Sequence, residues 1–429
     1  MYLCTHFYIM ANKRKIINDP VFGFLSLPNE LIYDVLQHPY VQRLNRIRQL
    51  GLSYLVYPGA MHSRFGHSLG AMHLMQEAIT SLRTKGVEIT EQEETSAMIA
   101  ILLHDIGHGP FSHVLEHTLV DGVTHEDISL LMMERINNDL MMRYATNGDA
   151  SLNDGPLDMA ISIFRNEYPK HFLHQLISSQ LDVDRMDYLC RDSFFTGVQE
   201  GRVASERLLK MLDVRNDKLV VQIKGIYSVQ KFLVARRLMY WQVYLHKTTV
   251  GYEKILVNAL KRAKLLAREG REIFASPALA YFLKNDIDAA WFDSHEEALS
   301  NYAELDDSDI WSALKVWRHH DDKILATLAT DLVDRRLFKV EVTEEPPTEE
   351  YLAAIRSRIV DTMGISNEDA SYMMSLTEIG KDMYNPEDDS IGILYKDGTV
   401  RDIAEASEIL NVQLLSKKIR KYYLCYQRV

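Results

Sequence analysis

Hydrophobic side chains recur at helical spacing along most of the first two-thirds of the chain. Pro39 suits the first position of a helix and Gly51 suits a C-terminal cap. Between them, apolar residues repeat every three positions, at Val41, Leu44, Ile47 and Leu50. This pattern predicts a helix over residues 39–51.

Other segments of the same part of the chain also have clear patterns. Thr90 and Glu93 have the spacing of a capping box, so a helix is expected to begin there and to continue through the apolar residues near 101. Residues 125–140 are amphipathic, and residues 227–268 predict a long helix that bends at Gly251. Residues 219–223 follow Asn216-Asp217 and indicate a strand or hairpin arm. The polar residues 145–155 indicate a loop.

The pattern changes beyond about residue 270. Residues 344–350 are acidic, contain two prolines and indicate a linker or turn. Residues 392–400 predict two short strands around Asp397-Gly398. We therefore expect a mostly α protein with minor β-hairpins. Its parts would be an N-terminal extension (1–15), a helical catalytic body (16–270) and a smaller mixed helical and α+β C-terminal region (271–429).

Composition narrows the class of protein. The 429 residues are 47% hydrophobic and 25% charged, which is ordinary for a globular protein. The formal net charge of -12 argues against sequence-independent binding of nucleic acid, which depends on a broad basic surface. The three cysteines lie far apart, and no segment has the roughly 18 consecutive apolar residues of a membrane span. These observations predict a soluble, cytoplasmic protein without a membrane partner.

A cluster of histidines and an aspartate follows the apolar helix that ends near residue 103. His104, Asp105, His108 and His113 fall within ten residues. Burying such groups without partners costs roughly several kcal/mol each, and a metal ion would offset this cost. Neighbours on a helix point about 100° apart, so further ligands must come from other segments. His67 and the aspartates of residues 182–187 are candidates, although the second segment also suits a solvated charged face.

The motifs and their order resemble those of one enzyme family. His67, His104-Asp105 and Asp184 look like the H…HD…D pattern of the HD-domain phosphohydrolases. The resemblance is closer to the deoxynucleoside triphosphate triphosphohydrolases, which include the sterile-alpha-motif/HD dNTPase of animals and bacterial homologues without the sterile alpha motif. It covers roughly residues 15–270 and rests on residues 49–51 (QLG), 57–60 (YPGA), 62–65 (HSRF), 67–70 (HSLG), 104–113 (HDIGHGPFSH), 124–126 (THE) and 182–188 (DVDRMDY).

The resemblance implies an HD-domain helical bundle and a metal-dependent hydrolase that converts dNTPs into deoxynucleosides and inorganic triphosphate. The implied metal ligands are His67, His104, Asp105 and Asp184. The implied catalytic residues are His108, His113, His125 and Glu116. The implied substrate-binding residues are Gln49, Leu50, Arg64, Arg185, Tyr188, Asp192, Arg236 and Tyr244. Apart from the resemblance, helical spacing places Arg236, Tyr240, Tyr244 and Lys247 on one face of the long helix predicted over residues 227–268.

Two imidazoles and two carboxylates suit iron, manganese, nickel or zinc, and magnesium or manganese would accompany the substrate phosphates. The resemblance further implies a homo-oligomer, dimer or tetramer, with a contribution from residues beyond 270, and allows for a nucleotide effector. Two alternatives stay open: an HD-type 5′-nucleotidase (a phosphomonoesterase) and a catalytically silent nucleotide-sensing module. Arginines outside the metal ligands favour a triphosphate substrate, and the complete histidine set favours catalysis. Base preference, the native metal and the need for an effector stay open.

Overall fold

Two buried helices form the centre of the protein, whose computed structural model describes residues 15–112, 118–146, 155–381, 384, 390–407 and 419–429. They are α3 (Arg64–Arg83) and α4 (Glu91–Leu103). The predicted capping box between Thr90 and Glu93 opens α4, and residues 96–103 are all buried. A helix that is apolar on every side belongs inside a core. His67, in the first turn of α3, and His104, at the end of α4, therefore lie deep in the molecule.

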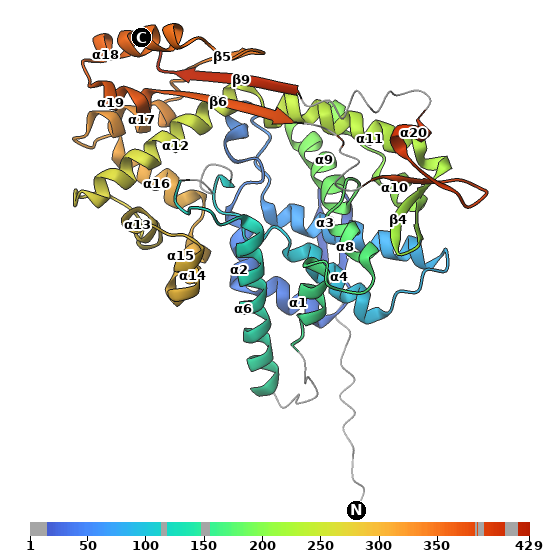
Figure 1. Cartoon of the computed structure of the whole chain (residues 1–429). Coiled ribbons are helices and arrows are strands. Elements are labelled where there is room, and N and C mark those ends of the chain that lie inside the picture. Colours follow the sequence, from blue (N-terminus) through green and yellow to red (C-terminus); the bar gives the residue numbers. More distant parts are fainter. Residues whose placement is uncertain (1–14, 113–117, 147–154, 382–383, 385–389, 408–418) are drawn as a thin grey trace, which may run out of the picture.

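Further helices surround this pair and complete the first two-thirds of the chain (Figure 1). Helix α9 packs along α3 and brings in the segment that contains Asp184. The surrounding helices are α1 (Glu30–Gln37), α2 (Pro39–Gln42), α6 (His125–Thr146), α7 (Asp158–Phe164), α8 (His171–Ile177), α9 (Val183–Thr196), α10 (Ser205–Met211), α11 (Ile226–Met239) and α12 (Lys247–Arg268).

Helices after residue 270 pack against the same body and reach the histidine cluster. The Tyr302 hydroxyl donates to the Gly107 carbonyl at 2.9 Å, and Arg43 Nε donates to the Leu305 carbonyl at 2.9 Å. The predicted boundary at residue 270 stays a prediction. The helices of this region are α13 (Pro277–Lys284), α14 (Ala289–Ser294), α15 (Glu296–Glu304), α16 (Asp307–Trp317), α17 (Lys323–Val333), α18 (Glu349–Met363), α19 (Asn367–Ala370) and α20 (Ile403–Ala406).

Three small sheets complete the fold. An N-terminal hairpin joins β1 (Lys15–Asp19) to β2 (Gly23–Leu27). A four-stranded sheet has the order β3 (Leu212–Arg215), β4 (Lys218–Gln222), β7 (Gly392–Leu394) and β8 (Val400–Asp402), with β4 and β7 parallel. An antiparallel sheet of β5 (Lys339–Thr343), β9 (Ile419–Tyr426) and β6 (Met374–Lys381) lies along α12 at one edge of the molecule (Figure 1).

The mostly α fold class and both predicted hairpins are confirmed. Asn216 and Asp217 turn between β3 and β4 with φ of 51° and 58°, and Gly398 turns between β7 and β8 with φ of 87°. The acidic residues 344–350 connect β5 to α18, as expected of a turn. Most of the predicted loop over 145–155 lies outside the described residues, and α6 continues to Thr146. None of the helices described is both long and apolar enough to cross a membrane.

Two predicted helices differ from the structure. The expected helix over 39–51 is a short α2 followed by a 3₁₀ turn over Arg43–Arg46, and Gly51 opens a second 3₁₀ turn. A strict repeat of three matches the 3₁₀ period of 3.0 residues per turn better than the α period of 3.6, and two 3₁₀ turns lie in this segment.

The long helix over 227–268 is interrupted, but not at Gly251, which lies inside α12. The break is a single π-helical turn over Tyr240–Tyr244, after which His246 caps the start of α12. Neither proline nor glycine marks this break in the sequence. Single π-turns are frequent at functional sites, and this one contributes Tyr240 and Tyr244 to a cavity.

Candidate metal centre and its cavity

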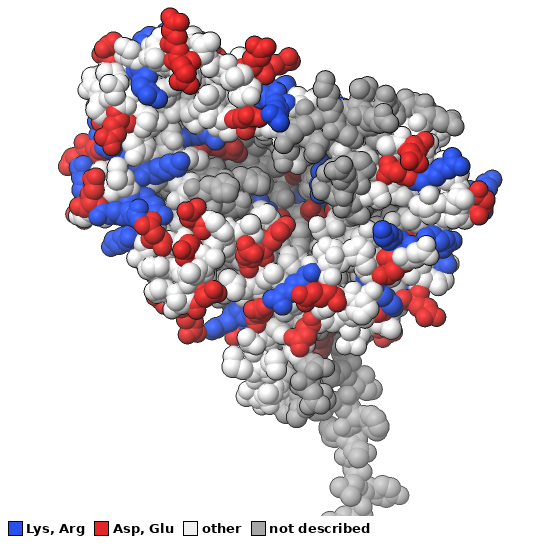
Figure 2. All heavy atoms as spheres, viewed as in Figure 1, with Lys and Arg blue, Asp and Glu red and all other residues white. Residues whose placement is uncertain are grey.

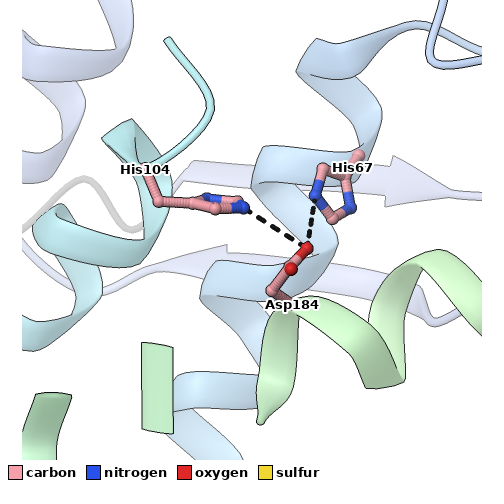
Figure 3. Close-up of side chains that lie close together, drawn as sticks. All are labelled: His67, His104 and Asp184. Carbon is pink, nitrogen blue, oxygen red and sulfur yellow. Dashed lines mark ion pairs between the residues drawn. The ribbon is translucent and has the colours of Figure 1, made fainter. Parts of the chain in front are cut away.

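His67, His104 and Asp184 meet in the core of the protein. Asp184 Oδ1 lies 3.1 Å from His67 Nε2 and 3.3 Å from His104 Nε2. Figure 3 shows both imidazoles directed at this carboxylate. Asp105 lies beside them, with Oδ2 3.6 Å from His67 Nε2 and Oδ1 3.4 Å from His104 Nε2. The four residues that the sequence suggested as metal ligands therefore converge from three helices.

The hydrogen bonds of the two imidazoles fit a metal ion. His67 Nδ1 lies 2.7 Å from Asp187 Oδ2, and His104 Nδ1 lies 2.6 Å from the Ile101 carbonyl oxygen. Protons on the Nδ1 atoms leave the Nε2 lone pairs free to bind a cation. Both Nε2 atoms are buried and have no hydrogen-bond partner among the described residues. A divalent ion held between these nitrogens and the carboxylates of Asp105 and Asp184 would satisfy them.

The pKa shifts show that this site attracts positive charge. Burial would lower the pKa of His67, but the carboxylates of Asp184 and Asp187 outweigh it and raise that pKa to about 10. Burial would raise the pKa of Asp184, but His104 and His67 hold it well below its usual range. The pKa of Asp105 is also lowered against the effect of burial, by His104, His108 and Arg64. A proton or a metal ion can neutralise the negative charge of these carboxylates, and a divalent ion neutralises more of it than a proton does.

A chain of buried ion pairs supports His67. Asp187, which accepts from His67 Nδ1, also accepts from Arg191 Nε at 2.9 Å and Nη2 at 2.8 Å. Arg191 Nη1 reaches Asp19 Oδ2 at 2.7 Å, so the chain ends at the N-terminal hairpin. A Cβ atom at Gly70 would collide with both Asp187 and Arg191, so the glycine makes room for the pair. Outer partners of this kind fix the orientation of a ligating imidazole.

We expect Asp187→Asn to weaken metal binding by about 10- to 100-fold, because the amide cannot accept the His67 proton as a carboxylate does. Metal affinity measured by chelator competition checks this, with Asp158→Asn as the matched control. Asp158 also accepts a hydrogen bond from a side chain, the partly buried bond from Asn137, but it lies on α7 and is not among the candidate ligands. An unchanged affinity in Asp187→Asn, with the control also unchanged, would show that the chain is only structural.

Two of the four candidate metal ligands, Asp105 and Asp184, border a cavity of about 580 Å³. This volume lies in the usual range for small-molecule sites, about 300–1,000 Å³. Its walls contain many of the residues that the sequence suggested: Gln49, Leu50, Arg64, Asp105, His108, His125, Asp184, Arg185, Tyr188, Asp192 and Tyr244. Their individual roles stay predictions, but the fold brings them to one place.

Arginine and histidine side chains lie next to the metal ligands in this cavity. Arg64 Nη1 donates to Asp105 Oδ2 at 2.6 Å. The His108 and His125 rings stack with centroids 3.9 Å apart, and His108 Nδ1 is hydrogen-bonded to the Ser112 hydroxyl. Arg185 Nε donates to the Ser179 carbonyl at 2.7 Å. The cavity thus combines cationic groups for an anion with imidazoles for proton transfer.

A second network holds the wall away from the ligands. Asp192 accepts from Tyr244 at 2.8 Å, and its other oxygen lies 2.7 Å from His62 Nε2. Tyr188 packs edge-on against Tyr244 with ring centroids 6.1 Å apart. Burial raises the pKa of Tyr188, so its hydroxyl stays protonated at neutral pH. Gln49 Oε1 is buried and without a partner among the described residues, so an acceptor is available there.

Four suggested residues lie elsewhere or cannot be placed. Arg236 is buried, donates to Gln180 Oε1 at 3.1 Å and does not line the cavity. It lies in α11, one turn before the π-turn that contains Tyr240 and Tyr244. His113 and Glu116 lie outside the described residues. Lys247, expected on the same helix face as Arg236, begins α12 instead.

Sequence reasoning assigned no role to several residues around the site, including Asp19, His62, Arg191 and Glu253. His62 stands inside one of the quoted motifs, and Asp187 was only one of the candidate carboxylates of residues 182–187; the structure places it behind His67, at Nδ1. A larger groove of about 1120 Å³ lies between α3, α9 and α10. Both groups of close metal-ligating atoms found among the described residues belong to the smaller cavity and its ligands, so that cavity is the candidate site.

Comparisons with known proteins agree with this geometry. The family described as HD domain matches residues 64–192, and the family described as HD associated region matches residues 203–273. The uncharacterized protein YwfO of Bacillus subtilis is 33% identical over 97% of this chain and 92% of its own length. A crystal structure of a phosphohydrolase from Bacteroides thetaiotaomicron shares 57% identity with a TM-score of 0.92, covering 97% of this chain and all of that one.

The chain is an HD-domain phosphohydrolase. A relative in Dictyostelium discoideum, described as a deoxynucleoside triphosphate triphosphohydrolase SAMHD1 homolog, is 32% identical over 60% of this chain. The alignment covers 51% of that relative, so this HD-domain phosphohydrolase spans about half of its length. A metal-dependent hydrolase follows from membership of the HD-domain phosphohydrolase family.

Proposed function

We propose that this HD-domain phosphohydrolase hydrolyses dNTPs at the α-phosphorus, giving a deoxynucleoside and inorganic triphosphate. The observation that carries this proposal is the shared cavity. Two metal-ligand carboxylates, Arg64, Arg185 and Tyr188 border one space of about 580 Å³. One guanidinium group can bind two phosphate oxygens at once, and a triphosphate has three or four negative charges to neutralise. The dNTPase names of relatives near 30% identity support the same substrate class.

Each group has a distinct task in this reaction. A divalent ion bound by His67, His104, Asp105 and Asp184 would act as a Lewis acid and lower the pKa of a bound water. Asp105 orients Arg64 toward the cavity through their 2.6 Å ion pair, so this guanidinium is in place before substrate binds. Arg185 is held beside Asp182 and Ser179 at the start of α9 and presents a second guanidinium.

The departing 5′-oxygen needs a proton. A histidine suits this step because its pKa lies near neutral pH. We expect His113 to donate this proton. His125 lines the cavity and stacks on His108, and we expect it either to orient His113 or to share its role as proton donor. The phenol of Tyr188 and the amide of Gln49 would contact the sugar, away from the phosphate groups.

Product analysis tests the proposal. The purified protein is incubated with each dNTP and Mn²⁺ or Mg²⁺ in ¹⁸O-labelled water. The products are separated by ion-exchange chromatography, and their molecular masses are measured by mass spectrometry. Triphosphate and deoxynucleoside in equal amounts, with the label in the triphosphate, are expected. Release of orthophosphate from 5′-mononucleotides, with dNTPs left intact, would instead support the phosphomonoesterase alternative. No turnover of any nucleotide by metal-loaded protein would support the silent sensing module.

We also propose that the protein is a dimer or tetramer. Ile16 and Phe24 are 63% and 75% exposed on the outer face of the β1–β2 hairpin, where their cross-strand partners are Ser26 and Asn18. Exposed apolar side chains that adjoin on one face are typical of contact surfaces. Light scattering at micromolar concentration is expected to give a multiple of the 49.5 kDa chain mass. A monomer mass with and without nucleotide would contradict this proposal.

Figure 2 shows acidic and basic side chains interspersed on the face in view, without a continuous basic surface there. This distribution supports a small anionic ligand bound in a cleft over a nucleic acid bound across a surface.

A further inference from the structure

Glu253 lines the candidate site from a wall that contains no metal ligand. It belongs to α12, which packs against α13, α17, β5, β9 and the 3₁₀ turn over Gly51–Leu55. The metal ligands come from α3, α9 and the end of α4, a separate group of packed helices. The cavity nevertheless includes both Asp184 and Glu253 in its lining. A ligand that fills it would touch the metal ligands with one part and α12 with another.

The carboxylate of Glu253 has no partner within the described ranges of the chain. No hydrogen bond or ion pair joins it to another described residue, whereas Asp105 pairs with Arg64 and Asp192 accepts from Tyr244. The side chain is partly buried. Burial raises the pKa of Glu253 to about 7, against a smaller opposing effect of Lys254. A carboxyl group in a binding cavity without donors of its own is typical of a group that meets a ligand.

The chemistry of a nucleotide limits what Glu253 can contact. Phosphate oxygens are excluded because they have the same charge and because Arg64 and Arg185 offer better partners on the metal side. The sugar has hydroxyl donors, but a contact there would serve all bases equally. The base edges differ: guanine presents N1–H and its amino group side by side, whereas thymine presents one N–H between two carbonyl oxygens. A carboxylate can accept two hydrogen bonds from guanine and meets carbonyl repulsion with thymine.

We propose that Glu253 selects the nucleobase by accepting hydrogen bonds from its ring N–H and amino donors, so that dGTP is preferred to dTTP. This inference rests on the proposed dNTP hydrolysis and adds a specificity residue to it. The cost of burying the charge would be offset by the two donors of guanine, which favour the ionised carboxylate.

The test compares kcat/KM for dGTP and dTTP in the wild type, Glu253→Gln and Glu253→Ala, with metal-loaded full-length protein. Glutamine keeps the size of the side chain but adds an amide N–H, which can donate a hydrogen bond to a carbonyl oxygen of thymine. We expect the ratio of kcat/KM for dGTP to that for dTTP to fall by at least about tenfold in Glu253→Gln, the lower end expected for loss of a bidentate base contact. Glu269→Gln is the matched control, because Glu269 is an exposed glutamate at the C-terminal end of the same helix.

The outcomes separate the inference from the proposed function. Hydrolysis by the wild type with an unchanged ratio in both Glu253 variants would overturn base selection and leave dNTP hydrolysis standing. An equal loss for all four dNTPs would likewise overturn it. A wild type that hydrolyses no dNTP would overturn both. If a variant unfolds at too low a temperature for rates to be compared, the dissociation constants for dGTP and dTTP are measured instead, by equilibrium dialysis below its melting temperature. A change of at least about tenfold in the ratio of the two constants is then the criterion for base selection.

Discussion

Replacing Asp105 with alanine is expected to lower kcat by at least about a thousandfold and to remove most of the bound metal. Asp105 approaches both ligating imidazoles and also pairs with Arg64 and His108. Its loss would leave the ion short of a carboxylate and strand a buried guanidinium. A metal ion contributes several kcal/mol of transition-state stabilisation, and each 1.36 kcal/mol is about tenfold in rate.

Two measurements on one preparation check this expectation: kcat with the preferred dNTP, and metal content by mass spectrometry of the digested protein. Asp121→Ala is the matched control, because Asp121 is an exposed aspartate whose backbone N–H donates to Ile287. The control should keep both metal and activity. Full metal content and turnover in Asp105→Ala would remove this residue from the ligand set and with it the account of the site given above.

Local sequence signals suggested the candidate metal ligands because their chemistry is unusual for their position. His104 and Asp105 end a helix whose last eight residues are all buried, and a pair of polar groups there requires a partner. The same reasoning could not find Asp19 or Arg191. Each is an ordinary charged residue in the sequence, and their connection to His67 exists only after the hairpin, α9 and α3 have packed together.

The interrupted long helix shows a different limit. Residues 227–268 have helical periodicity throughout, and the break at Tyr240–Tyr244 involves residues of middling helix propensity without a glycine or proline. Tertiary contacts hold the π-turn: the Tyr57 hydroxyl donates to the Gln242 carbonyl, and the Tyr423 hydroxyl donates to the Leu245 carbonyl at 2.9 Å. Both donors come from segments far from 240 in the sequence. Single-segment patterns therefore predicted the helix and missed the turn that shapes the cavity wall.

The proposed function implies a preference for dNTPs over rNTPs, and shortening Tyr188 to alanine is expected to narrow this preference by about tenfold or more. The ring of Tyr188 packs against Tyr244 and faces the same cavity as Gln49 and Leu50. A ribose 2′-hydroxyl between these groups would overpack the site or stay without a partner. Each effect costs about 1–3 kcal/mol, so together they would disfavour ribonucleotides by roughly two orders of magnitude.

The phenylalanine variant separates bulk from hydrogen bonding. If the ring excludes the 2′-hydroxyl by its size, Tyr188→Phe should keep most of the discrimination that Tyr188→Ala loses, because the two aromatic rings fill nearly the same volume. Rates with dATP and ATP, measured side by side for the three proteins, give the comparison directly. Equal hydrolysis of ATP and dATP by the wild type would refute this account of the cavity. The deoxynucleotide part of the proposed function would then fall, whereas the metal-dependent phosphohydrolase would stand, because the ligands His67, His104, Asp105 and Asp184 make no use of the sugar.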